Sequence, residues 1–252
     1  MEIPETFRSH PPRMLVLLPC FNEEGRIGAV VRDVRRGFPA ADVLVVDDAS
    51  DDRSPGEAAE AGARVLRHGC NLGYGVALET GYFFAQLHGY DVLVQMDSDG
   101  QHRPDQIPIL LSALDGESCD LVIGSRYGTG GAGPAWIRRV GHRIFAGLVF
   151  LLTRMRLTDP TSGFQALNAR ALRLFAGGFF PCDYPDSDVI LMAYMAGLRI
   201  REVPVRMKPR AGGTSMHSGL RPLYYALKMI LAMFIVLLNF QLWKNWRADT
   251  PN

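Results

Sequence analysis

Short apolar runs rich in valine, leucine and isoleucine recur through the first half of the chain. They lie at residues 14–18, 42–46, 64–68, 91–96 and 120–124. Runs of this length and composition are typical of parallel strands that are buried on both faces. Amphipathic stretches that suit helices separate them. The alternation predicts an α/β fold with a Rossmann-like, mainly parallel sheet flanked by helices, whose ligands bind at the carboxyl ends of the strands.

Helices are expected between these strands, at about 23–36, 54–60, 74–88 and 104–114. The second half is less regular, and there the sequence predicts helices at 137–153, at 169–176 and after an Asp-rich turn at 182–188, with a pair of strands around 199–207. Residues 223–243 are apolar over most of their length. We expect a catalytic domain over residues 1–219 and a C-terminal membrane-associating helix over residues 220–252.

Composition excludes several classes of protein. Of 252 residues, 48% are hydrophobic and 21% are charged, which argues against collagen-like, coiled-coil and multi-span membrane proteins. Four cysteines lie far apart and without zinc-site spacing, so neither a structural zinc site nor a disulfide framework is expected. The N-terminal residues lack the apolar segment that secretion requires, and we expect a cytoplasmic protein.

Charge is distributed unevenly between the two halves. Residues 1–120 carry 20 acidic and 10 basic residues, a net charge of −10, and residues 121–252 carry 6 acidic and 17 basic residues, a net charge of +11. The basic residues of the second half lie among long apolar runs. This combination favours a membrane surface as the partner and argues against nucleic acid.

The segment DVLVQMDSDGQH at 91–102 carries two carboxylates, Asp97 and Asp99, at the end of a predicted strand. The two-residue period of a strand places both on one side and Ser98 on the other. Two carboxylates can hold Mg²⁺ or Mn²⁺ together with the phosphate oxygens of a substrate. A simple turn after the strand is the alternative. A calcium loop is excluded because its twelfth position is Pro108 instead of Glu.

Polar groups also follow the first two predicted strands, in PCFNEEG at 19–25 and VVDDASDD at 45–52. Each could separately be a loop acid or a helix cap. Together with MDSDGQH, they resemble the nucleotide-sugar site of family 2 glycosyltransferases, which have the GT-A fold. The resemblance covers nearly the whole chain and is strongest to the dolichyl- or polyprenyl-phosphate mannose synthase branch. It extends through NLGYGVALETGY, GSRY, DPTSGF and GLRIREVPVRMKPRAGGTS.

The resemblance implies a role for individual residues. The nucleoside would contact Pro19, Phe21, Glu23, Val46 and Asp48. The metal and diphosphate loop would comprise Asp97, Ser98, Asp99 and Gln101, with Asp97 and Asp99 as the metal ligands. Two arginines, Arg126 and Arg210, would face the phosphates.

Two positions depart from the pattern of the family. The synthases usually show R-x-x-G-x-S-K in the loop of Arg210, whereas Met216 replaces the lysine here and His217 follows it. Asp188 stands where these enzymes often carry Glu. Both departures concern the acceptor more than the donor chemistry.

The resemblance implies an inverting glycosyltransferase that uses Mg²⁺ or Mn²⁺. It would move a sugar from a UDP- or GDP-sugar to a lipid-linked acceptor, polyprenyl phosphate, at the inner face of the membrane, with Asp97, Asp99 and Arg126 as catalytic groups. A phosphate acceptor is already an anion and needs no base. A hydroxyl acceptor needs a carboxylate to take its proton, and the candidates are Asp188, Asp186 and Asp159.

Other functions also fit these residues. A glycosyltransferase acting on a glycan hydroxyl, a nucleotidyltransferase and a non-catalytic nucleotide-sugar-binding protein would share many of these residues. Gly73-Tyr74-Gly75 weakly indicates a dinucleotide site, but its third glycine is replaced by Leu78. The apolar segments 144–152 and 223–243 fit interfacial helices, and buried core helices or an oligomer interface are the alternatives.

Overall fold

A computed structural model describes residues 12–114, 118–127, 146–182, 185–208 and 221–249. Seven strands in these residues form one sheet of order β3-β2-β1-β4-β6-β5-β7. Strand β6 is antiparallel to both of its neighbours, and the other pairs are parallel. The strands are β1 Met14–Cys20, β2 Asp42–Asp47, β3 Arg64–Arg67, β4 Val92–Gln95, β5 Leu121–Ser125, β6 Gln165–Asn168 and β7 Ile200–Pro204.

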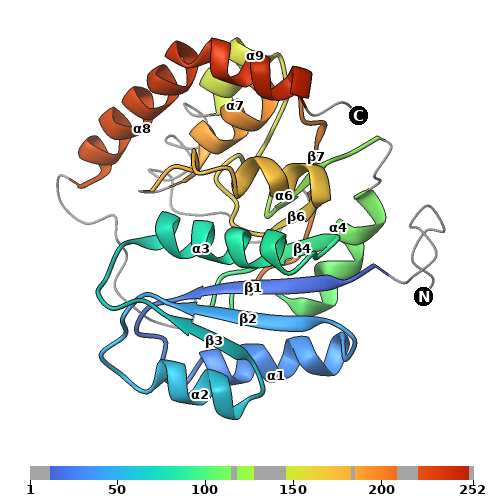
Figure 1. Ribbon diagram of the computed structural model, residues 1–252, viewed down its shortest axis with the longest axis vertical. Helices are drawn as coiled ribbons and strands as arrows, with labels where there is room; N and C mark the ends of the chain where they lie inside the picture. Colours follow the sequence, from blue (N-terminus) through green and yellow to red (C-terminus); the bar gives the residue numbers. More distant parts are fainter. Residues whose placement is uncertain (1–11, 115–117, 128–145, 183–184, 209–220, 250–252) are drawn as a thin grey trace.

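Helices cover both faces of the sheet (Figure 1). Alternate residues of β1 point to opposite sides, so that Leu15 and Leu17 join a core cluster with α3 while Val16 and Leu18 join a second cluster with α1. The helices are α1 Ile27–Gly37, α2 Ser54–Glu60, α3 Tyr74–Leu87, the 3₁₀ turn η1 Pro104–Gln106, α4 Ile107–Ala113, α6 Ala169–Phe175, α7 Ser187–Met195, α8 Arg221–Leu238 and α9 Phe240–Asp249. Residues 146–153 are also helical.

The α/β fold and the mainly parallel sheet are confirmed, with three corrections. Strand β6 was not predicted, because QALN is short and lacks an apolar run. The expected strand pair around 199–207 is one strand, β7, followed by an isolated antiparallel bridge between His102 and Met207. The helix expected from residue 23 begins at Ile27.

The C-terminal apolar segment is not one helix but two, which meet at Asn239. The Asn239 side chain donates to the Ile235 carbonyl at 2.9 Å, and the Asn239 amide donates to the same carbonyl at 3.2 Å. The Trp243 indole donates to the Val236 carbonyl at 2.8 Å across the junction. Among the residues described, no helix has both the length and the hydropathy needed to cross a membrane.

The topology brings several loops to one edge of the sheet. Strands β1, β2 and β4 run in parallel, so the loops that follow them leave from the same edge. Because β6 runs in the opposite direction, the segment that enters it reaches that edge as well. Residues far apart in the sequence, from 20 to 164, therefore surround one site.

Candidate active site at the carboxyl edge of the sheet

The loops after β1 and β2 are joined to each other. The Asp48 amide donates to the Cys20 carbonyl at 2.8 Å, and the Asn22 amide donates to Ser50 Oγ at 2.9 Å. The Glu23 amide donates to Ser54 Oγ at 2.7 Å. These bonds hold the two predicted nucleoside-binding segments side by side.

Four of the predicted nucleoside contacts lie around this junction. Pro19 and Val46 are paired neighbours in adjacent strands, and both are buried. Phe21 is 45% exposed, so its ring is available to a ligand. Glu23 forms an ion pair with Arg26 at 2.5 Å. The structure thus brings these side chains to one edge, with Phe21 the most accessible of them.

The fifth predicted nucleoside contact, Asp48, is buried and holds a neighbouring loop. Its carboxylate accepts hydrogen bonds from the amides of Leu72 and Gly73, at 2.9 and 2.8 Å, and lies 2.7 Å from His68 Nδ1. Burial alone would raise the pKa of the Asp48 carboxyl, but these hydrogen bonds outweigh it and lower the pKa below its ordinary value. Asp48 is therefore ionised and fixes the loop at 68–73.

The acidic loop after β4 has the predicted alternation. Asp97 and Asp99 are partly exposed, whereas Ser98 between them is buried. Asp99 accepts hydrogen bonds from the Gln101 amide at 2.9 Å and from the Gln101 side chain. The two carboxylates and Gln101 thus belong to one compact turn.

Two further residues contact Asp97 and were not predicted. The Tyr74 hydroxyl donates to Asp97 Oδ1 at 2.9 Å. The Asp97 amide donates to His102 Nδ1 at 2.9 Å, and His102 Nε2 lies 3.5 Å from Asp97 Oδ2. Burial lowers the pKa of the His102 imidazole, against the opposing effect of Asp97 and Asp99. His102 lies within the motif DSDGQH, but only the fold shows that its ring turns back toward Asp97.

The residues present fit a divalent cation that shares its coordination with a substrate. The described part of the chain contains no cluster of three or more His, Cys, Asp or Glu side chains that could hold a metal by itself. Asp97 and Asp99 supply two carboxylates, which is the number Mg²⁺ commonly takes from protein when phosphate oxygens complete its shell. Gly163 lies directly beside Asp97, since a Cβ there would stand 3.0 Å from Asp97 Oδ1.

Arg126 follows β5 and is oriented by a buried acid. Its Nε donates to Asp159 Oδ2 at 2.7 Å, and Asp159 is fully buried. About a third of the Arg126 side chain is exposed, so the guanidinium can meet both Asp159 and a ligand. Arg210 lies outside the described residues, as do Met216 and His217. The segment that leads toward Arg210 is anchored at the acidic loop, because the Lys208 amide donates to the Gln101 carbonyl at 2.8 Å.

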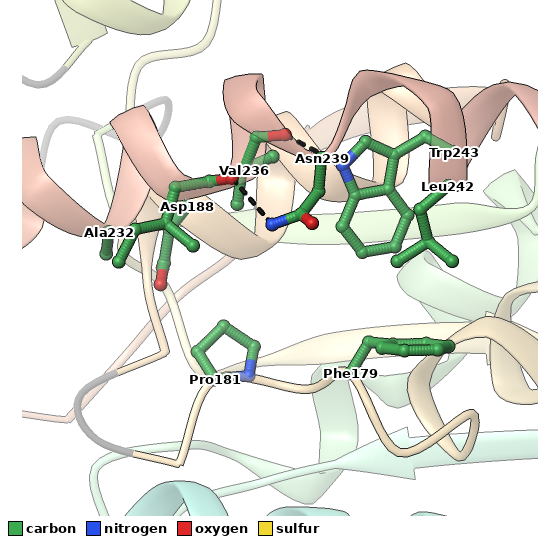
Figure 2. A pocket seen from close by; sticks show the side chains of 9 residues that line it. Phe179, Pro181, Asp188, Ala232, Val236, Asn239, Leu242 and Trp243 are labelled. Carbon is green, nitrogen blue, oxygen red and sulfur yellow. Dashed lines mark hydrogen bonds between the residues drawn. The ribbon is translucent and has the colours of Figure 1, made fainter.

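Asp188 lies at an apolar pocket of about 310 Å³ between the 179–181 segment and helices α8 and α9. Figure 2 shows Phe179 and Pro181 facing these helices across the pocket, with Asp188 at one end and Trp243 at the other. Asp188 Oδ1 accepts the amides of Asp186 and Val189, and Oδ2 has no hydrogen-bond partner among the residues that the structure describes. Burial raises the pKa of the Asp188 carboxyl to about 6.

The sequence of this chain is similar to that of known glycosyltransferases. The sequence profile described as glycosyl transferase family 2 matches residues 15–175. The chain is 35% identical over 222 residues to undecaprenyl-phosphate mannosyltransferase of Micrococcus luteus, covering 82% of this chain and 88% of that protein. It is 32% identical over 228 residues to polyprenol monophosphomannose synthase of Mycolicibacterium smegmatis, covering 86% of this chain and 85% of the other.

Solved structures support the same fold. Glucosyl-3-phosphoglycerate synthase from Mycobacterium tuberculosis, crystallised with Mn²⁺, uridine-diphosphate-glucose and phosphoglyceric acid, superposes with a TM-score of 0.67 at 21% identity. The match covers 96% of this chain and 81% of that chain. The sheet and its helices are thus those of GT-A proteins, and the sequence relatives share most of their length with this protein. The chain belongs to glycosyl transferase family 2, and it is a hexosyltransferase.

Proposed function

We propose that this glycosyltransferase takes a sugar from a UDP- or GDP-sugar with the help of Mg²⁺ or Mn²⁺ and inverts the anomeric centre. The observation that carries the proposal is the pair Asp97 and Asp99 at the edge where the loops after β1 and β2 also meet. Asp97 and Asp99 would hold the cation, which neutralises the departing diphosphate when it is bound. Arg126, fixed by Asp159, adds positive charge at the same edge.

We propose polyprenyl phosphate as the acceptor. Two of the relatives are named for this chemistry, an undecaprenyl-phosphate mannosyltransferase and a polyprenol monophosphomannose synthase. An acceptor phosphate oxygen would attack the anomeric carbon as the bond from that carbon to the diphosphate breaks. The phosphate is an anion at neutral pH, so no side chain has to remove a proton. Of the three candidate bases, Asp159 already pairs with Arg126 through Oδ2.

Residues 220–252 would bring the enzyme to a membrane surface at the inner face of the cell membrane. Helix α8 is apolar on two sides, with Met229, Met233 and Val236 in the core. Its other side exposes a row that we call the outer apolar face, made of Ile230, Leu231, Phe234, Ile235 and Leu238. Exposed apolar residues with nearby cations are typical of interfacial helices.

The helix at 146–153 has similar character. Phe150, Leu151 and Leu152 are exposed, and the guanidiniums of Arg154 and Arg156 each lie 5.9 Å from the centre of the Phe150 ring. Apolar side chains bordered by arginines suit a surface of anionic lipid. This second segment supports the proposed membrane contact.

The experiment is an acceptor and donor screen with the purified full chain. UDP- and GDP-sugars are each offered with polyprenyl phosphate in detergent, with a soluble glycan, and with either Mn²⁺ or EDTA. The proposal expects metal-dependent formation of polyprenyl-phosphate sugar. Transfer only to the glycan would overturn the acceptor, and undiminished transfer in EDTA would overturn the role of the metal.

A hydroxyl acceptor is the second candidate, and Asp188 is the observation in its favour. Its unpartnered oxygen and its pKa of about 6 suit a base that works near neutral pH. Asp188→Asn separates the two candidates. Loss of about 10² to 10⁴ in rate with donor binding retained would favour the hydroxyl acceptor.

A further inference from the structure

Two side chains contact Asp97, Tyr74 at Oδ1 and His102 near Oδ2. The Tyr74 hydroxyl donates to Oδ1 at 2.9 Å, while His102 lies 3.5 Å from Oδ2 and accepts the Asp97 amide. Phe164 stacks on the His102 ring with a centroid distance of 5.0 Å. A carboxylate at the end of a strand would otherwise turn freely about its side-chain bonds.

The Tyr74 hydroxyl also takes part in a chain of hydrogen bonds that leads from the partly exposed Tyr74 into the core. The Gln95 side-chain amide donates to the Tyr74 hydroxyl at 3.3 Å, and the Tyr82 hydroxyl donates to the Gln95 side-chain oxygen. Tyr82 is fully buried and contacts the rings of Phe175 and Phe180 edge to face. The chain Tyr82, Gln95, Tyr74, Asp97 therefore links the acidic loop to the core.

Because residue 163 is a glycine, there is room beside it for the hydrogen bond between Tyr74 and Asp97. A Cβ at position 163 would stand 3.0 Å from both the Tyr74 hydroxyl and Asp97 Oδ1, which is tighter than ordinary contact. The turn entering β6 thus packs directly against the bond between Tyr74 and Asp97. A side chain at position 163 would therefore press against this hydrogen bond.

Tyr74 also follows the loop that Asp48 holds. The two amides bound by Asp48 belong to Leu72 and Gly73, the residues immediately before Tyr74. The predicted nucleoside end and the predicted metal end of the site are therefore connected through three consecutive residues. A shift of the loop at 68–73 would move the Tyr74 hydroxyl away from Asp97.

We propose that Tyr74 is a positioning residue, whose hydroxyl orients the Asp97 carboxylate for the divalent cation and the donor diphosphate. The proposal rests on the proposed function, because it takes Asp97 as a metal ligand. Groups that orient a ligand are worth about 10- to 100-fold in metal affinity or activity when they are removed. Tyr74→Phe deletes the hydroxyl and keeps the ring.

The test measures Mn²⁺ binding and turnover with Tyr74→Phe. Calorimetry in the presence of UDP or GDP should show Mn²⁺ affinity lowered by about 10- to 100-fold. The Mn²⁺ concentration for half-maximal rate should rise by the same factor, while KM for the donor at saturating Mn²⁺ stays within about 2-fold of the parent value. A merely structural role would instead lower the unfolding temperature and move all of these quantities together.

Tyr90→Phe is the matched control. The Tyr90 hydroxyl also donates to a carboxylate, Asp42 Oδ2 at 2.7 Å, but Asp42 lies at the amino end of β2, away from the site. This variant should leave Mn²⁺ affinity unchanged. Tyr82→Phe provides a second variant, which should weaken Mn²⁺ binding in the same direction by a smaller factor.

Unchanged Mn²⁺ affinity in Tyr74→Phe, while Asp99→Ala loses it, would overturn the role of Tyr74 and leave the proposed function standing. If Asp99→Ala also binds Mn²⁺ normally, both the positioning role and the metal assignment are wrong. Weakened Mn²⁺ binding in Tyr74→Phe with Tyr90→Phe normal supports the proposal.

Discussion

Residues 1–120 and residues 121–252 meet at one sheet edge but differ in charge and in architecture. The first part has a net charge of −10 and contributes parallel strands followed by the predicted nucleoside and metal loops. The second part has a net charge of +11 and contributes the antiparallel strand β6, Arg126 and helices with exposed apolar residues.

The difference in charge and architecture suits the two parts to different ligands. Carboxylates at the ends of buried strands can bind a cation, and they are held by backbone that the core fixes. Basic and apolar side chains on peripheral helices suit an extended anionic and apolar surface. We infer that the first part chiefly binds the donor and that the second chiefly presents the acceptor.

The largest expected effect comes from Asp99→Ala in the first part. The variant should lower turnover by at least about 10²- to 10³-fold, as loss of a key electrostatic group in a transition state does. Mn²⁺-dependent nucleotide binding, followed by calorimetry, should be lost as well. Asp105→Ala is the control, because Asp105 is an exposed acid of the same segment that pairs with Arg103. Normal metal binding by Asp99→Ala would contradict the inference that residues 1–120 bind the donor and its metal.

A smaller effect is expected from the outer apolar face in the second part. Phe234→Glu with Leu238→Glu should weaken binding to anionic vesicles by about 10-fold or more, because each side chain loses roughly 1 to 2 kcal/mol of apolar burial. Vesicle co-sedimentation measures this, and donor binding should be unaffected. Leu87→Glu, at an exposed leucine that ends α3, is the control. Equal vesicle binding by the parent, the double variant and Leu87→Glu would show that the outer apolar face does not bind a membrane.

The smallest effect on turnover is expected from Asp188→Asn, within about 2-fold if the acceptor is a phosphate. Its effect on stability should depend on pH. The pKa of Asp188 is about 6 in the folded chain and lower when unfolded, so the folded state binds more protons between about pH 4 and 6. The parent should therefore lose stability as pH rises through this window, by up to about 3 kcal/mol.

Asp188→Asn cannot ionise and should show a flatter profile across that window. At pH 7 it should be more stable than the parent, while at pH 4 the two should be similar. Thermal unfolding at several pH values measures the difference. A parent that gains stability between pH 4 and 6 relative to the variant would show that the carboxyl is not destabilised by burial.

Much of the first part could be predicted from sequence, because its strands are continuous apolar runs and the two-residue period orients their last side chains. The predicted bounds of α2, 54–60, coincide with those in the structure. Asp97 and Asp99 are partly exposed and Ser98 is buried, as expected, but these residues lie in the turn beyond β4, which ends at Gln95, so the strand period is not the cause. In residues 1–120, local sequence patterns are therefore sufficient to predict most of the strands and helices.

The missed features depend on contacts between distant segments. Strand β6 has only four residues, and it forms a strand because it pairs with β4 and β5. Tyr74, at the start of a helix, and His102, in a turn, both contact Asp97, and no pattern in the sequence predicts these contacts.

The reversed direction of β6 also constrains insertions and deletions. Phe164, just before β6, and Ala166 within it belong to one core layer, and Leu167 of β6 belongs to the other. One residue added between Gly163 and Gln165 would either displace Gly163 from Asp97 or exchange the two sets of side chains. The length of this turn is therefore coupled to core packing. Chimeras between relatives should fail when the junction changes the length of the turn at 159–164.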